Sequence, residues 1–221
     1  MPTLLVINPN SNPAVTAGID GAVSGLRSGL GADISVVGLD GTPFGIETQR
    51  DVEAVATPVA EHVAAHGDAY DAFVIACFSD PGLHAAREAT DRPVLGIAQS
   101  GLLTALSLGE SIGVISIGSG SLARHWRTYR SMGIAARVAA DLPLGATVAE
   151  LADTTRLGDR MLSTGRRLVH DHGAAVLVLG CAGMAHYRAD LERSLGVTVV
   201  DPTQAACAHA LGAAALGYRT R

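Results

Sequence analysis

The stretch "AAVLVLGCAGM", Ala174–Met184, decides the expected fold. Its apolar letters VLVL predict a buried strand, the glycine predicts a turn, and the amphipathic segment from Met184 onward predicts a helix. Cys181 is therefore expected at the carboxyl end of a strand, just before a helix begins. In open α/β sheets ligands bind at that edge, and a helix N-terminus favours an anion such as a thiolate.

A second stretch repeats this order. "AFVIACFSDPGL", Ala72–Leu83, is again an apolar strand that runs into a cysteine, Cys77, followed by a Pro-Gly turn and a helix. The two cysteines lie 104 residues apart (77 to 181), close to half of the 221-residue chain. The other expected strands pair across the halves in the same order: Leu4–Ile7 with Ile112–Ile117, Ile34–Val37 with Ala136–Ala139, and Val94–Ile97 with Val197–Val200. The sequence thus predicts an internal duplication of β-α units.

Helical patterns fill the segments between these strands. They are expected at Pro13–Leu30, Glu47–His66 with an interruption at Pro58, Leu83–Thr90, Ser100–Leu108, a segment ending at Met132, Thr147–His172, Met184–Leu195 and Pro202–Leu216. This alternation predicts an α/β protein of two similar Rossmann-like lobes with parallel sheets, related by a pseudo-two-fold axis, with the active site in the cleft between them. We expect residues 1–98 and 208–221 to form the first lobe and residues 99–207 the second.

The composition narrows the class of protein. Hydrophobic residues make up 48% and charged residues 17%, which favours a sizeable core over disorder. A net charge of −5 argues against nucleic-acid binding. The sequence has no apolar run of transmembrane length and no signal-peptide pattern at its N-terminus, so we expect a cytoplasmic protein that does not bind membranes. Three cysteines, an odd number, fit free thiols better than a disulfide framework.

Two matched thiols suit one kind of chemistry. Inverting a stereocentre by proton transfer needs a base on one face of the carbon and an acid on the other, and the roles swap for the mirror-image substrate. Cys77 and Cys181 would serve if one enters as the thiolate and the other as the thiol. Backbone N–H groups of the glycine-rich loops could hold the enolate, so no metal or cofactor is expected.

Four motifs carry a family resemblance: "INPNSN" near the N-terminus, "ACFSDPGL", "LGCAGM" and "VVDPTQAA". In this order, over essentially the whole chain, they resemble the aspartate/glutamate/hydantoin racemase superfamily, and particularly its hydantoin and allantoin racemase branch. The resemblance implies a cofactor-independent racemase of a small molecule, in two α/β lobes and in a homo-oligomer, with Cys77 and Cys181 as the acid/base pair. It also implies substrate contacts, by position, from Asn8, Ser11, Phe78, Ser79, Ser116, Ala182 and Gly183.

Departures from the family pattern bear on the substrate. Ser79 stands where hydantoin racemases often have glycine, and "SIGSGS" replaces a threonine-rich stretch. Amino-acid racemases of the superfamily carry Asn-Thr and Thr-His after the two cysteines, where this chain has Phe-Ser and Ala-Gly, which favours a neutral hydantoin-type ring. Aspartate or glutamate racemisation, maleate-type isomerisation and non-catalytic binding of a small molecule stay open. The pair of thiols argues against arylmalonate decarboxylase activity, which relatives perform with one.

The remaining candidate residues have simpler interpretations. Cys207 lies in an apolar helix and is expected to be a buried hydrophobe. His84 and His186 could activate a thiol or bind a metal, but without a tight ligand spacing we expect surface or cap residues. Asp80 either orients a catalytic group or belongs to the Asp-Pro-Gly turn. The segment "SGSLARHWRTYR", Ser119–Arg130, is interpreted as a solvated helix face or a subunit contact.

Overall fold

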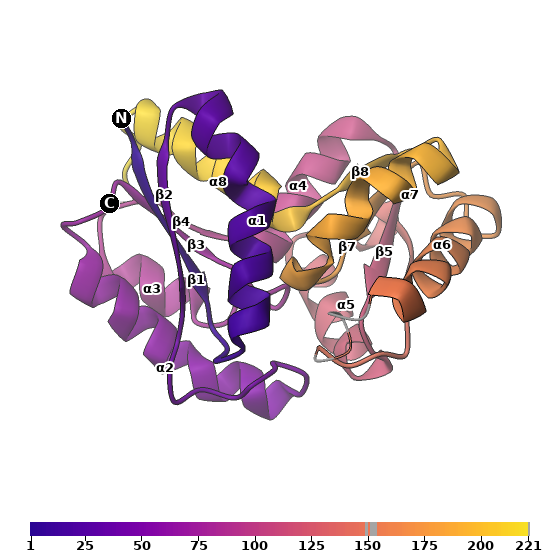
Figure 1. Ribbon diagram of the computed structural model, residues 1–221, viewed down its shortest axis with the longest axis horizontal. Coiled ribbons are helices and arrows are strands. Elements are labelled where there is room, and N and C mark those ends of the chain that lie inside the picture. Colours follow the sequence, from indigo (N-terminus) through magenta and orange to yellow (C-terminus); the bar gives the residue numbers. More distant parts are fainter. Residues whose placement is uncertain (149, 151–153, 221) are drawn as a thin grey trace.

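The computed structural model describes residues 1–148, 150 and 154–220. Two lobes lie side by side (Figure 1), each built on a four-stranded parallel sheet. The first sheet has the order β2-β1-β3-β4 and the second the order β6-β5-β7-β8. Mapping β1–β4 onto β5–β8 makes the two orders identical, which confirms the expected α/β class and the repeated order of the strands.

The bounds of most elements follow the sequence prediction. The strands are β1 (Thr3–Asn8), β2 (Asp33–Gly38), β3 (Ala72–Ile75), β4 (Val94–Gly96), β5 (Ile112–Ser116), β6 (Val138–Pro143), β7 (Val176–Leu179) and β8 (Thr198–Val200). The α-helices are α1 (Pro13–Leu30), α2 (Gln49–His66), α3 (Leu83–Ala89), α4 (Ile97–Leu108), α5 (Leu122–Ser131), α6 (Thr154–His170), α7 (Arg188–Leu195) and α8 (Pro202–Ala215). Short 3₁₀ turns include η1 (Ser119–Ser121), η2 (Ala135–Arg137) and η4 (Ala182–Tyr187).

Three expectations need correction. Helix α2 runs through Pro58 without a break, because buried valines three or four residues apart hold both halves of the helix on the sheet and a capping box at Thr48 fixes its start. The strand expected at Ala136–Ala139 begins only at Val138, after the turn η2. The segment from Met184 starts as the turn η4, and α7 follows. Of the helix expected at Thr147–His172, residues 149 and 151–153 lie outside the described residues.

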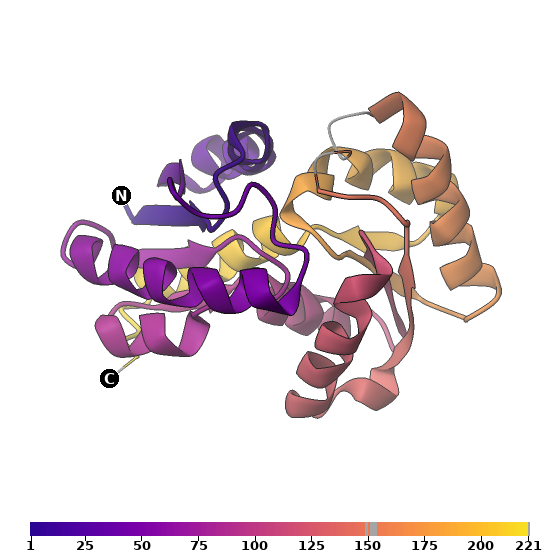
Figure 2. The same ribbon diagram turned by 90° about the horizontal axis from the view of Figure 1, so that it is seen from below.

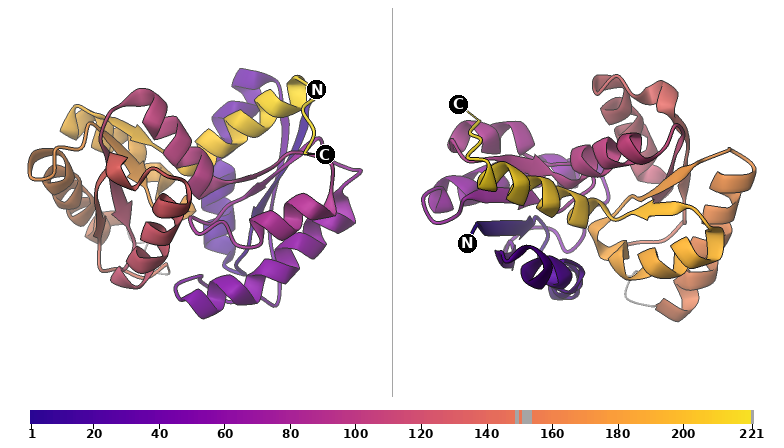
Figure 3. Two further views of the ribbon diagram at one scale, coloured as in Figure 1. Left: turned by 180° about the vertical axis from the view of Figure 1, so that it is seen from behind. Right: turned by 90° about the horizontal axis from the view of Figure 1, so that it is seen from above.

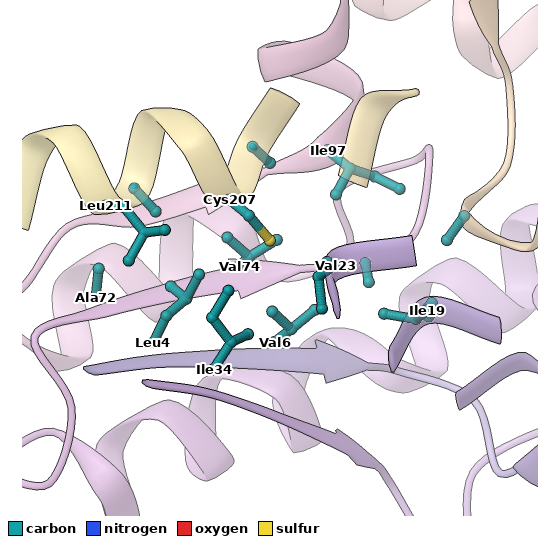
Figure 4. Packing of buried hydrophobic residues seen from close by; sticks show 14 of the residues in the cluster. Leu4, Val6, Ile19, Val23, Ile34, Ala72, Val74, Ile97, Cys207 and Leu211 are labelled. Atoms are coloured by element: carbon teal, nitrogen blue, oxygen red, sulfur yellow. The ribbon is translucent and has the colours of Figure 1, made fainter. Parts of the chain in front are cut away.

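Apolar side chains cover both faces of each sheet. In the first lobe α1 and α8 pack on one face of the sheet and α2 and α3 on the other. Figure 2 shows α1 on one side of this sheet and α2 with α3 on the opposite side. In the second lobe α6 and α7 cover one face and α4 and α5 the other. Figure 4 shows the face under α8, where Cys207 is fully buried beside Val74, Leu4 and Leu211. Cys207 is therefore a core residue, as expected.

The last helix of each half packs on the opposite lobe. Helix α4 follows the first sheet but packs on β7 and β8, and α8 follows the second sheet but packs on β1, β3 and β4. The two exchanged helices pack against each other on the side of the molecule that Figure 3 shows from behind. The division expected from the sequence, residues 1–98 with 208–221 and residues 99–207, stays a prediction, and its boundaries fall inside α4 and α8. None of the helices in the described part of the chain is both long and apolar enough to cross a membrane.

A glycine allows the contact between the exchanged helices. A Cβ atom on Gly101 of α4 would lie 2.8 Å from the Pro202 Cβ atom and 3.1 Å from its Cα atom, and a proline ring at a helix start cannot turn away. We predict that Gly101→Ala destabilises the protein by about 1–3 kcal/mol, because the added methyl group overpacks this contact. Urea unfolding followed by circular dichroism would measure the change.

Gly212→Ala is the matched control. Gly212 lies within α8, and a Cβ atom there would meet nothing within 4 Å. The change should stabilise the helix by up to about 1 kcal/mol, since alanine is the better helix former. Equal unfolding free energies for the two variants would contradict the tight contact.

Candidate active site

Two equivalent strands deliver the two cysteines to one cavity. Strand β3 and strand β7 are buried along their whole length, and Cys77 and Cys181 follow them closely at their carboxyl ends. Both cysteine residues are half-buried, and both line a cavity with a volume of about 270 Å³. The residues of the first lobe that line it are Asn10, Val15, Ile46, Glu47, Thr48, Ala76, Cys77, Phe78 and Ser79. Those after β5 are Ile117, Gly118, Gly120, Ser121, Arg124, His125, Ala146, Val148, Gly180, Cys181 and Ala182.

Burial and neighbouring charges raise the pKa of both thiols. The pKa of Cys77 rises to about 11, mainly because of burial and further because of the Asp80 carboxylate, while hydrogen bonds from Ser79 and the charge of Arg124 lower it. The pKa of Cys181 rises to about 12, mainly through burial and then through the charge of Cys77. Because each thiolate disfavours the other, the pair favours one thiolate and one thiol over two thiolates.

Asparagines brace the loop after β1. Asn8 is fully buried, and its Nδ2 atom donates to Asn10 Oδ1 at 3.0 Å and to Thr16 Oγ1 at 2.9 Å. Asn10 Oδ1 also accepts the backbone N–H of Asn12 at 2.9 Å, and Asn12 caps α1. These bonds hold the loop so that Asn10 lines the cavity. Ser11 points elsewhere, donating its hydroxyl to the Thr42 carbonyl at 2.9 Å.

A buried polar network lies behind the second-lobe wall. The Asp141 carboxylate accepts a hydrogen bond from the Ser116 hydroxyl, contacts His125 Nδ1 at 2.9 Å and accepts the Tyr129 hydroxyl at 2.7 Å. Burial and the adjacent carboxylate raise the pKa of Tyr129 well above its ordinary value. His125 lines the cavity and packs edge-on against Phe78, with ring centroids 5.1 Å apart. Ser116 is fully buried, so it supports His125 rather than the cavity surface.

Arg124 reaches from α5 to the first lobe. Its Nε atom donates to Ser79 Oγ at 2.9 Å, and its Nη2 atom donates to the Glu47 carbonyl at 3.3 Å. Nη1 donates to the Gly120 carbonyl at 3.4 Å. The side chain of Arg124 thus joins the loops of both lobes at the cavity wall.

The structure brings five of the nine expected site residues to the cavity. Cys77, Phe78, Ser79, Cys181 and Ala182 line it, whereas Asn8, Ser11, Ser116 and Gly183 are not among the described residues that do. Gly183 instead donates its backbone N–H to the Cys181 sulfur at 3.4 Å.

The acidic and histidine candidates lie apart from the cavity lining. Asp80 caps α4: its carboxylate oxygens accept the backbone N–H groups of Ala98 and Gln99, each at 2.9 Å. His84 and His186 are exposed and do not line the cavity. No group of three or more potential metal ligands occurs within the described ranges of the chain.

Sequence reasoning missed several cavity residues. Arg124 and His125 lie in the segment interpreted as a solvated helix face, yet both are buried, as is Tyr129 one turn later. The available signal was their spacing, which places all three on one side of α5. Thr48 is the N-cap residue of the capping box of α2 and Glu47 directly precedes it. Both lie at the end of the loop that follows β2, and α/β proteins build sites in such loops.

Comparison with known proteins agrees with this architecture. The model of the Asp/Glu/Hydantoin racemase family matches residues 4–210. The chain is 36% identical to the hydantoin racemase of Paenarthrobacter aurescens, covering 98% of this chain and 93% of that one, and 36% identical to the hydantoin racemase of Pseudomonas sp. strain NS671, covering 97% and 87%. The solved structure of allantoin racemase from Klebsiella pneumoniae superposes with a TM-score of 0.95 at 30% identity, covering 100% of this chain and 91% of that one. The protein therefore belongs to the Asp/Glu/Hydantoin racemase family.

Proposed function

We propose that the protein is a racemase of a hydantoin-type ring, a 5-substituted hydantoin or allantoin, with Cys77 and Cys181 as its acid/base pair. The observation that carries the proposal is the placement of two thiols, from equivalent strand ends of the two lobes, on the wall of one cavity. The identity of 36% to two hydantoin racemases and the likeness to an allantoin racemase support the substrate class.

The proposed reaction is a proton exchange at one carbon. One thiolate removes the hydrogen from the ring stereocentre; the C–H bond breaks, an S–H bond forms, and the electron pair moves into the adjacent carbonyl to give an enolate. The opposite thiol then donates its proton to the other face, and its S–H electron pair stays on sulfur as a thiolate. The mirror-image substrate uses the two cysteines in reversed roles.

The lining of the cavity favours a largely apolar, small substrate. Val15, Ile46, Ile117 and Val148 contribute aliphatic surface, and Phe78 contributes a ring held by His125. Gly118 and Gly120 bring main-chain groups to the wall without side chains, so their N–H groups are candidates to hold the enolate oxygen.

Amino-acid racemisation is the second candidate. The buried guanidinium of Arg124 lines the cavity, and a cation is the group that a substrate carboxylate would require. The residues after the two cysteines, Phe78 with Ser79 and Ala182 with Gly183, offer less grip on such a carboxylate, so we rank the ring first.

The oligomeric state and the cellular location are further parts of the proposed function. We propose a homo-oligomer, as the family resemblance implies, and light scattering after size-exclusion chromatography would test it. A cytoplasmic location fits the three cysteines, which are all free thiols.

Loss of optical rotation is the direct test of the reaction. Reduced protein without added cofactor should racemise L-5-substituted hydantoins or S-allantoin and leave L-aspartate and L-glutamate unchanged. Decay with the amino acids alone would replace the substrate class but keep the thiol chemistry. No decay with any of these compounds would overturn the proposal.

Single-thiol variants test the roles of the cysteines. Cys77→Ser and Cys181→Ser should each lower the racemisation rate by at least about 10²–10⁴-fold, the usual contribution of a positioned acid or base. Each variant should still exchange the ring hydrogen of one enantiomer with deuterium from the solvent, because one thiolate can still reach one face. Proton NMR in D₂O measures this exchange. Cys207→Ala is the matched control, and racemisation by the Cys77→Ser variant at the wild-type rate would contradict the mechanism.

The raised pKa of both thiols predicts an alkaline activity profile. Burial holds these pKa values above the ordinary range, so at neutral pH only a small fraction of the protein carries the required thiolate. Below its pKa a thiolate fraction grows about tenfold for each pH unit, and kcat/KM should rise in proportion between about pH 6 and 8. Circular dichroism of the substrate, corrected for uncatalysed racemisation at each pH, measures the profile. A maximum near pH 6 would show that the base is a different group.

A further inference from the structure

Arg124 is a buried cation without a carboxylate partner. Arg124 is 8% exposed, and none of the ion pairs in the described ranges of the chain includes it. Its hydrogen bonds go to neutral oxygens, the Ser79 hydroxyl and the carbonyls of Gly120 and Glu47. Asp51, the acidic residue whose charge it feels, already accepts the N–H groups of its own capping box. Buried charges are normally paired with an opposite charge, but no carboxylate among the described residues forms an ion pair with this guanidinium.

Ser79 connects this cation to Cys77. The Ser79 hydroxyl oxygen accepts the Arg124 Nε–H at 2.9 Å, so its own hydrogen remains available to a further acceptor. Ser79 lies two residues after Cys77, and hydrogen bonding from its backbone and its side chain lowers the pKa of the Cys77 thiol. A thiolate at Cys77 would therefore be the acceptor at the end of a chain of hydrogen bonds that begins at the guanidinium.

No such chain of hydrogen bonds from a cation reaches Cys181 from the residues that the structure describes. Its sulfur accepts one backbone N–H, from Gly183 at 3.4 Å, and the residue after it is Ala182. The charged groups that it faces are acidic: Cys77 when ionised, Asp201 and Glu47. Cys77 also faces an acid, Asp80, but the carboxylate of Asp80 is held by two N–H groups at the start of α4, and Arg124 faces Cys77 from the other lobe. The two thiols are thus chemically identical and electrostatically different.

We propose that Arg124 is a positioning residue that keeps the resting negative charge of the thiol pair on Cys77, acting through the Ser79 hydroxyl. The inference rests on the proposed function, because it deepens the roles of the same two cysteines. In the fraction of the resting enzyme that carries one thiolate, the negative charge then lies on Cys77 and the proton on Cys181. For the enantiomer whose hydrogen faces Cys77, the base is already ionised. For the other enantiomer, a proton must first move from Cys181 to Cys77 so that Cys181 becomes the base.

The rate of alkylation by iodoacetamide, an uncharged reagent, reports the thiolate fraction of each cysteine separately. The experiment uses the full-length protein without substrate, from about pH 6 to 10, with mass spectrometry of the peptides that contain Cys77, Cys181 and Cys207. Thiolates are the reactive species, so Cys77 should react faster than Cys181 at every pH below the two pKa values. Buried Cys207 should stay unmodified and thereby report that the protein remains folded.

Variants of Arg124 test whether its charge stabilises the Cys77 thiolate. In Arg124→Gln the pKa of Cys77 should rise by about one unit, which lowers the rate of Cys77 alkylation about tenfold at each pH below that pKa. Arg124→Lys should restore part of this rate, since it keeps the charge. Arg127→Gln is the matched control, because Arg127 is an exposed cation one turn further along α5 that does not line the cavity, and the Cys77 profile should not move.

Ser79→Ala provides a second variant that keeps the guanidinium. It should also slow Cys77 alkylation, while Cys181 alkylation changes by less than about twofold in either variant. Equal reactivity of the two thiols in the wild type, or an unchanged Cys77 profile in both Arg124→Gln and Ser79→Ala, would overturn the inference. A rise in KM confined to anionic substrates, with unchanged alkylation, would assign Arg124 to a substrate carboxylate and overturn it as well.

The alkylation result is independent of turnover. If the protein fails to racemise any substrate while Cys77 loses reactivity in Arg124→Gln, the proposed function fails and the electrostatic role of Arg124 stands. If racemisation succeeds and the Cys77 profile does not depend on Arg124, the proposed function stands and this inference fails.

Discussion

The contact between α4 and α8 determines how the two sheets face each other. Each helix follows the last strand of one sheet and closes the core of the other, so neither lobe buries both faces of its sheet without a helix from the other half of the chain. Gly101 and Pro202 meet where these helices cross. Because the exchange is reciprocal, it joins the lobes with the ends of β3 and β7 at one cavity. The proximity of the two cysteines is therefore a consequence of how the cores are closed.

The strands and the duplication were predictable because they depend on local patterns. Apolar runs, turns and cap residues fix β1, β3, β5 and β7 within the sequence itself, and the fixed spacing of the halves then gives the order of the strands. The failures have local causes as well. Pro58 predicts a break, but burial of Val55 and Val59 on either side outweighs the hydrogen bond that proline removes.

The site was only partly predictable because some of its residues act across the lobes. Cys77, Cys181 and the residues directly after them follow strand ends, so their place could be predicted from the chain. Arg124 reaches the loop of the other lobe, and nothing within "SGSLARHWRTYR" indicates that its inward face meets polar atoms rather than an apolar core. Asn8 shows the opposite case: it lies in the motif that carries the resemblance, yet its amide braces the loop and Asn10 faces the cavity.

The two halves cap the helix after their last strand in different ways, and both capping carboxylates lie close enough to a cysteine to affect its pKa. The N-terminus of α4 is capped by Asp80 from the loop after Cys77, whereas α8 is capped by its own Asp201, which accepts the Gln204 N–H at 2.7 Å. Burial raises the pKa of both carboxyls to about 6, so both are largely ionised at neutral pH and each raises the pKa of the cysteine beside it. The caps therefore act on the two thiols alike, and a symmetric pair would follow if they were the only charges. Among the described residues Arg124 has no counterpart beside Cys181, so the asymmetry of the pair comes from one residue of α5 rather than from the helix caps that the fold requires.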